Sequence, residues 1–178
     1  THARGIIVYA ANTTFKAGGN ITLNGISSGN QGVYFSGTAW STAGNISITG
    51  SGNGGVYIGT GTIAAGNATS NPSSGGTITV SATGNASGYY GLWVNASSIV
   101  SYGAISITAT AVGDHAFRLE GTGGKVQSAS DITISATQGT WGLTMYNNTF
   151  IQSTKANSAS TGNISIIASG TRGGFYTN

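Results

Sequence analysis

Three short sequence patterns return in a fixed order along this chain, at intervals of 23 to 36 residues. The first pattern alternates apolar and hydroxyl residues. It begins as Asn-Ile-Thr-Leu at residue 20 and recurs from residues 45, 77, 104, 131 and 163. Side chains two positions apart on a strand share a face, so this alternation predicts a strand with one apolar side. Recurrence of one pattern through the whole chain indicates a repeat architecture.

The other two patterns complete a three-strand unit. The second begins as Gly-Ile-Ile-Val-Tyr at residue 5 and recurs from residues 32, 55, 91, 116, 142 and 174. The weaker third starts at residues 14, 39, 62, 98, 125 and 150, and Gly or Asn turns separate all the segments. Because the connections vary in length, a parallel β-solenoid fits better than a β-sandwich, which is the alternative fold. We predict an all-β parallel β-helix with three strands per coil and six to seven coils, forming a single segment over residues 1–178, cut from a longer repetitive rod.

Period-two alternation assigns the apolar residues of the first two patterns to the interior. We expect like residues to stack on like from coil to coil. The predicted interior pairs are Ile21/Leu23, Ile46/Ile48, Ile78/Val80, Ile105/Ile107, Ile132/Ile134, Ile164/Ile166, Val33/Phe35, Val56/Ile58, Leu92/Val94, Phe117/Leu119 and Leu143/Met145.

The outward middle position of the second pattern carries aromatic residues. Read from coil to coil, this position is Ile7, Tyr34, Tyr57, Trp93, Arg118, Thr144 and Tyr176. A flat strip of rings suits the apolar face of a sugar ring, so Tyr34, Tyr57, Trp93 and Arg118 are the candidate ligand-binding residues. The alternative is a structural ladder, covered by loops such as residues 85–90, because cross-strand aromatic pairs also stabilise sheets.

The first pattern predicts two outward hydroxyl ladders, which include Thr22, Ser47 and Thr79 in one row and Thr49, Ser81 and Thr108 in the other. Flat threonine ladders occur in ice-binding solenoids, which these rows resemble in outline. However, Ser alternates with Thr, and Asn24 and Ile167 interrupt the second row. A solvated strand face is the simpler interpretation, and ice binding stays a remote alternative.

Charge is too sparse to support most other functions. Charged residues make up 5% of the chain, the six cations are dispersed, and no run of basic residues exists, so we expect no nucleic-acid partner. No apolar run is long enough to span a membrane, so we expect no membrane insertion.

The few charged side chains also form no catalytic pair. Asp114 and Glu120 lie six residues apart on an extended segment, a separation of about 20 Å, which is too far for a carboxylate pair that cleaves polysaccharides. Arg118 and Glu120 are expected to form an exposed ion pair. We predict that the chain is not an enzyme and has neither cofactor nor metal site, and cysteine is absent.

Eight asparagines begin an Asn-x-Ser/Thr sequon, about twice the number that this composition gives by chance. They are Asn12, Asn20, Asn45, Asn67, Asn85, Asn95, Asn147 and Asn163. Turn chemistry alone can produce such an excess, because Asn and Ser are common turn residues. If the sequons are used, we expect Asn95 and Asn147 on or beside the second pattern, and Asn20, Asn45 and Asn163 at the turn that enters the first.

The recurrent Gly-Asn-Ile-(Ser/Thr)-(Ile/Leu) at residues 19–23, 44–48 and 162–166 resembles the large adhesins exported by two-partner secretion in Gram-negative bacteria. Filamentous haemagglutinins and the high-molecular-weight Haemophilus-type adhesins are the most similar in repeat style. The resemblance implies a right-handed β-helix on the bacterial cell surface, secreted through an outer-membrane partner. It also implies contact with host-cell glycans or glycoproteins, and hexose addition at Asn sequons by a cytoplasmic transferase.

Two functions follow from this resemblance. The chain is either an adhesin segment that binds a host-cell glycan through the aromatic face, or a passive stalk that displays a distal binding domain. Exposure of the aromatic face favours binding, and burial of that face under loops favours the stalk.

Overall fold

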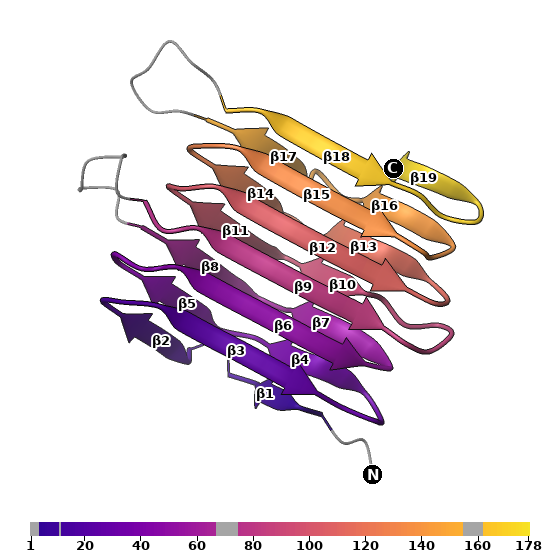
Figure 1. Ribbon diagram of the computed structural model, residues 1–178, viewed down its shortest axis with the longest axis horizontal. Coiled ribbons are helices and arrows are strands. Elements are labelled where there is room, and N and C mark those ends of the chain that lie inside the picture. The colour runs from indigo at the N-terminus through magenta and orange to yellow at the C-terminus, as the bar shows by residue number, and fades with distance from the viewer. Residues whose placement is uncertain (1–3, 11, 67–74, 155–161) are drawn as a thin grey trace.

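The computed structural model describes residues 4–10, 12–66, 75–154 and 162–178, in which all regular secondary structure is β-strand. Nineteen strands are assigned within these ranges, and they form three parallel sheets (Figure 1). Consecutive strands along the chain belong to different sheets, and each strand pairs with the strand three places further on. This topology is the predicted parallel β-helix with three strands per coil.

We name the sheets after the three sequence patterns that form them. Sheet A contains β1 (Ile6–Val8), β4 (Gln31–Phe35), β7 (Gly54–Ile58), β10 (Leu92–Asn95), β13 (His115–Glu120), β16 (Trp141–Met145) and β19 (Gly173–Thr177). Sheet B contains β2 (Thr14–Ala17), β5 (Thr38–Ser41), β8 (Gly61–Ala65), β11 (Ser97–Ser101), β14 (Lys125–Ser128) and β17 (Phe150–Ser153). Sheet C contains β3 (Ile21–Ile26), β6 (Ile46–Gly52), β9 (Ile78–Gly84), β12 (Ile105–Ala111), β15 (Ile132–Thr137) and β18 (Ile164–Ala168).

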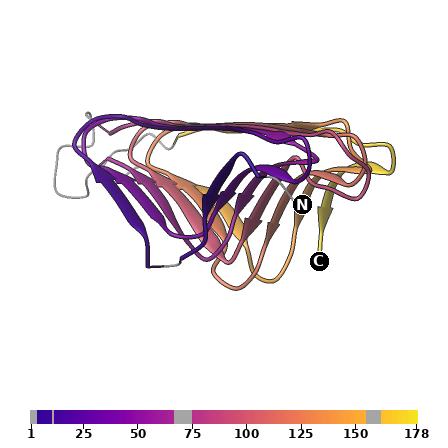
Figure 2. The ribbon, with the colours of Figure 1, turned by 90° about the horizontal axis from the view of Figure 1, so that it is seen from below.

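The coil path is right-handed. In Figure 1 the strands of sheet C run from left to right on the near side, and the other two sheets lie behind them. Each further coil lies above the previous one, which gives the hand expected for parallel strands joined by crossovers. Figure 2 looks along the stack and shows sheet C as a long flat side, with the other sheets across the core.

The core is a set of columns of like residues, as the alternation predicts. Ile46, Ile78, Ile105 and Ile132 follow one another in register along sheet C, and each is at most 1% exposed. The predicted interior of sheet A is also buried from Val33 to Leu143. In the last coil, by contrast, Ile164 and Ile166 are 45% and 39% exposed, because no described strand of sheet C lies beyond β18.

Buried serines fix the corner between sheets B and C. Ser101 and Ser128 are at most 2% exposed, and each hydroxyl donates to a backbone carbonyl in the corresponding turn of the preceding coil, at 2.5 and 2.7 Å. Each also accepts a backbone N–H from its own turn, from Gly103 and Ser130. Ser41 makes the same pair of bonds. The serine column therefore connects successive coils at this corner by hydrogen bonds.

Glycine is required where sheet C turns into sheet A. A Cβ added to Gly32, Gly55 or Gly91 would lie 2.3 to 2.4 Å from a backbone atom of a neighbouring strand. Side-chain-free residues at this column let the backbones of sheets A and C approach closely, which explains why the second pattern opens with Gly in most coils.

Candidate functional site

The outward row of sheet A has the predicted order and register. Successive strands pair Ile7 with Tyr34, Tyr34 with Tyr57, Tyr57 with Trp93, Trp93 with Arg118, Arg118 with Thr144, and Thr144 with Tyr176. The Tyr34 and Tyr57 rings are stacked with centroids 4.6 Å apart, and the Tyr57 and Trp93 rings meet edge to face at 5.0 Å. All three side chains are half-buried, and their rings contact one another along the row.

Rings from outside this row extend it. Tyr9 follows β1 and lies 4.8 Å from Tyr34, Tyr90 precedes β10 and lies 4.8 Å from Trp93, and Tyr146 follows β16 and lies 5.8 Å from Tyr176, measured between ring centroids. We call the seven rings together the aromatic strip: Tyr9, Tyr34, Tyr57, Tyr90, Trp93, Tyr146 and Tyr176. The strip runs along sheet A from the first coil to the last.

Arg118 lies in the middle of the strip, inside a cage of three rings. Its guanidinium carbon is 5.3, 5.5 and 5.0 Å from the ring centroids of Tyr90, Trp93 and Tyr146. Its Nη1 donates to the Tyr90 hydroxyl at 2.9 Å, while Nε and Nη2 both donate to Glu120 Oε2. A cation over several ring faces is attracted by their quadrupoles, so Arg118 holds the turns that carry Tyr90 and Tyr146 against the sheet.

The Arg118–Glu120 ion pair is confirmed, but the expectation that it is exposed is wrong. The Arg118 side chain is 25% exposed and that of Glu120 is 13% exposed. The cage rings shield the pair from water, and two of them, Tyr90 and Tyr146, lie in turns outside the repeated strands. Burial opposes the charge on Arg118, yet its hydrogen bond to Glu120 and the nearby Tyr90 and Tyr146 hydroxyls raise its pKa overall.

The His115 side chain packs against the cage. Its ring stacks on Tyr90 with centroids 5.5 Å apart, its Nε2 lies 3.0 Å from Asp114 Oδ1, and its Nδ1 is buried without a hydrogen-bond partner. Burial lowers the pKa of His115 and outweighs the opposing effect of Asp114. Burial also raises the pKa of the Tyr90 phenol, although Arg118 acts in the opposite direction. Both groups are therefore uncharged at neutral pH.

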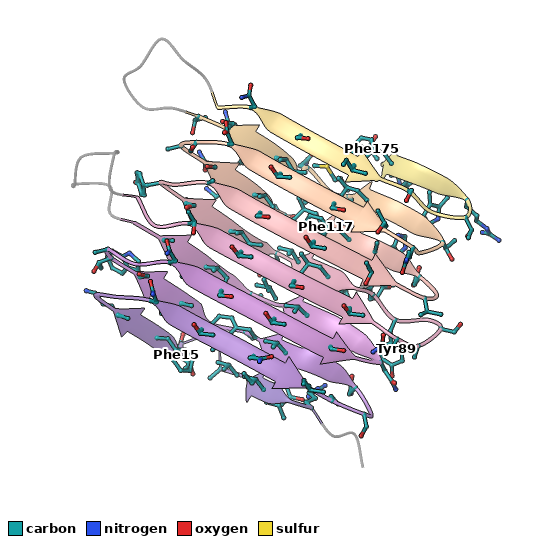
Figure 3. The ribbon with its side chains drawn as sticks, viewed as in Figure 1. Phe15, Tyr89, Phe117 and Phe175 are labelled. Atoms are coloured by element: carbon teal, nitrogen blue, oxygen red, sulfur yellow. The ribbon has the colours of Figure 1, made fainter. Side chains whose placement is uncertain are left out.

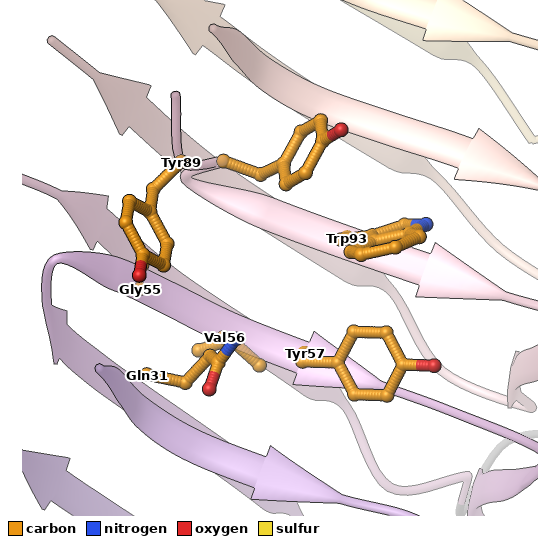
Figure 4. Close-up of a pocket in the computed structure, with 8 residues that line it drawn as sticks. Gln31, Gly55, Val56, Tyr57, Tyr89 and Trp93 are labelled. Atoms are coloured by element: carbon orange, nitrogen blue, oxygen red, sulfur yellow. The ribbon is translucent and has the colours of Figure 1, made fainter. Parts of the chain in front are cut away.

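A small indentation of about 10 Å³, room for about one water molecule, lies where the strip meets the turn before β10 (Figure 4). Tyr57 and Trp93 form one side, and Tyr89, Tyr90 and Gln31 complete the lining together with the backbone of Gly54 and Gly55 and with Val56. The indentation thus combines ring faces with the amide of Gln31 and the backbone of two glycines.

The first coils of the strip carry a second cation. The Arg4 guanidinium lies 4.5 Å above the Tyr34 ring centroid and donates from Nε to Gln31 Oε1 at 3.0 Å. Burial, and then the neighbouring Tyr57, raise the pKa of the Tyr34 phenol. Tyr34 therefore stays neutral, and its hydroxyl can act as both donor and acceptor.

The structure brings all four predicted ligand-binding residues together, but Arg118 is already paired with Glu120 and Tyr90. Sequence reasoning missed Tyr9, Tyr90, Tyr146 and Arg4. Tyr9 and Tyr146 each follow an outward residue of the row by two positions, so the period of two could have placed them on this face. Tyr90 lies in an irregular turn, where no periodic signal exists.

The sequons differ in how their amides are used. Asn20 and Asn45 lie at the turn into sheet C as predicted, are exposed, and accept a backbone N–H of the next coil through Oδ1. Asn85 and Asn95 instead donate from Nδ2, to Ser51 Oγ and to the Tyr57 hydroxyl. The remaining described sequon residues are exposed, namely Asn12, Asn147 and Asn163, and Asn67 lies outside the described residues.

The described carboxylates and histidines form no metal site. Within residues 4–10, 12–66, 75–154 and 162–178, no three His, Cys, Asp or Glu side chains are grouped in a way that could hold a metal ion. Asp114 contacts His115, and Glu120 contacts Arg118.

The chain is a right-handed parallel β-helix, and its sheet A carries the aromatic strip. A scan against protein-family models, a search of curated proteins and a search of solved structures each found no match. In the described part of the chain there is no helix with the length and hydrophobicity that crossing a membrane requires.

Proposed function

We propose that this chain is a segment of a secreted bacterial surface adhesin, and that it binds host-cell glycans through the aromatic strip. The observation that carries the proposal is the in-register row of Tyr34, Tyr57 and Trp93, whose rings lie 4.6 and 5.0 Å apart and are half-exposed. In this proposal the chain reaches the Gram-negative cell surface by two-partner secretion through an outer-membrane partner, and an Asn-hexosyltransferase acts on its sequons. Two observations support glycan binding: the length of the strip and its half-buried rings, which are partly open to solvent.

The strip offers both kinds of contact that a sugar ring needs. The exposed parts of the Tyr57 and Trp93 rings can contact the apolar face of a hexose, while the amide of Gln31 and the Tyr34 hydroxyl provide hydrogen bonds at its edge. Because rings repeat from coil to coil at about 5 Å, an oligosaccharide lying along the strip would contact several of them at once. An extended chain of sugars fits this surface better than a single residue.

The charge around Arg118 favours a neutral glycan. An unpaired guanidinium would favour an acidic sugar, since it can bind a carboxylate through two hydrogen bonds. Here three of the five N–H groups of Arg118 donate to Glu120 and Tyr90, and the Glu120 carboxylate offsets its charge. Arg118 is therefore a positioning residue in this proposal: it holds Tyr90 against Trp93 rather than contacting the ligand.

A passive stalk is the second candidate, and one observation favours it. Tyr90 and Arg118 cover part of Trp93, and the Trp93 indole Nε1 is buried without a hydrogen-bond partner. In a stalk the rings contribute only to stability, each cross-strand pair by about 1 kcal/mol or less.

A glycan array probed with the wild-type chain and two variants separates the candidates. We expect Tyr57→Ala and Trp93→Ala to lose most glycan binding while the thermal midpoint changes little. Trp40→Ala is the matched control, since Trp40 is a half-buried outward ring on sheet B and should leave binding intact. Arg118→Ala tests the charge argument, and a selective loss of acidic glycans in that variant would contradict it. If the wild type binds no glycan, or binding survives both strip substitutions, the stalk is the better description.

A further inference from the structure

The outer face of sheet C carries threonine and serine in a checkerboard. Each of the four middle strands presents one Thr and one Ser at its first two outward positions, and their order reverses from one strand to the next. A third, half-buried outward column does not alternate: Ser51, Thr83, Thr110 and Thr137. The pairs are Ser47 and Thr49 on β6, Thr79 and Ser81 on β9, Ser106 and Thr108 on β12, and Thr133 and Ser135 on β15. The strand register keeps both columns aligned, so every Thr has Ser neighbours along the stack and along its own strand.

This pattern gives the face a regular relief. All four threonines are exposed, whereas Ser47, Ser81 and Ser135 are half-buried between them. Threonine is larger than serine by one methyl group, so the threonines are raised and these three serines lie in hollows, whereas Ser106 is exposed like the threonines. Figure 3 shows these short, oxygen-tipped side chains standing on the near sheet.

The eight hydroxyl groups of the checkerboard on the outer face of sheet C are free to contact a partner. None of the eight hydroxyls forms a hydrogen bond with another described residue, and Figure 2 shows the sheet as flat. The outward positions of the sheet C strands include no charged residue, and Asp131 lies just before β15. Two such faces therefore would not repel one another through like charges.

We propose that the outer face of sheet C is a self-pairing surface that binds the same face of a second copy of this chain. A two-fold axis parallel to the coil stack, placed between the two columns, sets Ser106 opposite Thr108 of the second copy, and Thr108 opposite Ser106. The same rotation sets every other Thr of the checkerboard opposite a Ser. A two-fold axis parallel to the strands, between β9 and β12, also matches Thr with Ser, here Thr79 with Ser106. Large side chains then enter the hollows of the partner, as in interdigitated sheet interfaces.

The size of the face sets the strength of this pairing. Six strands about 4.8 Å apart, each about 20 Å long, present roughly 500 Å² per copy, or roughly 1,000 Å² for the pair. Stable interfaces bury about 1,200–2,000 Å² in total, so this chain should form a weak, concentration-dependent dimer. Every added coil would enlarge the interface, because the same two columns continue along the stack.

Sedimentation of the chain over a range of concentrations tests the proposal. We expect the wild type to dimerise and Thr108→Lys to weaken dimerisation about tenfold or more, since each dimer would bury two added charges. Gln127→Lys is the matched control: it places the same charge outward on sheet B, and dimerisation should persist. Because Thr108 is exposed, thermal melting should show that the lysine variant remains folded. The glycan array reads a different face, so the two proposals can fail independently.

Size-swap variants test the checkerboard without adding charge. Ser81→Thr sets Thr against Thr in either orientation and should weaken dimerisation, because Ser81 is half-buried and the added methyl group fills its hollow. Restoring a smaller opposing residue should recover it: Thr79→Ser if the axis is parallel to the stack, and Thr108→Ser if it is parallel to the strands. The second substitution that restores dimerisation also identifies the direction of the two-fold axis.

Three results would overturn the proposal. One is a wild-type chain that remains monomeric at the highest soluble concentration. Another is a dimer that Thr108→Lys leaves unchanged. The third is a monomer whose sheet C face shapes growing ice crystals in a Thr108-dependent way, which would assign the face to ordered water instead of a second copy.

Discussion

Individual side chains in this molecule act through their position in a column, and Arg118 is the clearest case. The sequence places it in a row with Tyr57 and Trp93, but the turns on either side bring Tyr90 and Tyr146 over it. A residue that looks like a free cation in the repeat pattern is therefore the centre of a closed cluster.

His115 should make stability depend on pH. Its pKa in the folded state lies below the ordinary value of about 6.5, so the unfolded chain binds the proton more readily. The free energy of unfolding should therefore fall as the pH drops from about 6.5 towards the lower folded pKa. Urea unfolding at pH 7.5, 6.5 and 5.5 measures this. His115→Gln should flatten the slope in this range, and an unchanged slope would mean that another group titrates.

The sequons should be used unequally. In Asn20 and Asn45 the Oδ1 atom accepts a backbone N–H, which leaves Nδ2, the atom that receives a sugar, free and exposed. Asn95 uses Nδ2 in a hydrogen bond to Tyr57 and is half-buried. Peptide mass spectrometry of protein from its native host should find hexose on Asn45 and Asn20 in preference to Asn95. The reverse order, or an unmodified mass, would contradict this.

At the scale of strands, the period of two and the repeated patterns were enough to predict register residue by residue. The row from Ile7 to Tyr176 and the isoleucine columns were assigned in this way, because parallel pairing of like strands leaves one alignment that keeps the apolar face inside. The covering of the strip could not be predicted. It depends on turns such as the one through Gly88, whose φ of 77° no periodicity encodes. The corner serines were also missed, since nothing in their own pattern indicates the carbonyl that each one binds.

The serine corner should contribute measurably to stability. Ser128→Ala leaves the buried Gly103 carbonyl and the Ser130 N–H without their partner, which should cost about 1–3 kcal/mol. Chemical denaturation of the chain measures the loss. Ser98→Ala, on the half-buried outward side of β11, is the control and should change stability by less than about 0.5 kcal/mol. Equal effects of the two substitutions would show that the corner bonds are dispensable.

For the molecule as a whole, each coil packs only against its neighbours, so damage in the middle divides the stack. Ile107 is 1% exposed within an unbroken isoleucine and valine column. Ile107→Asp buries a charge with no partner and should unfold the central coils. Circular dichroism should show lost sheet signal and a much lower thermal midpoint. Ser106→Asp, the exposed neighbour on β12, should melt like the wild type, and equal melting of Ile107→Asp would refute the assignment of faces.

The direction of the backbone hydrogen bonds also has a mechanical consequence. In all three sheets these bonds run along the coil stack, from each strand to its copy in the next coil. Tension between the two ends of the rod therefore acts on the hydrogen bonds of one coil boundary at a time, and the coils unfold one after another. A coil of 25 to 32 residues releases about 80–110 Å of extended chain. Under flow, such a rod would lengthen in steps and dissipate the pull coil by coil before its attachment point carried the full force.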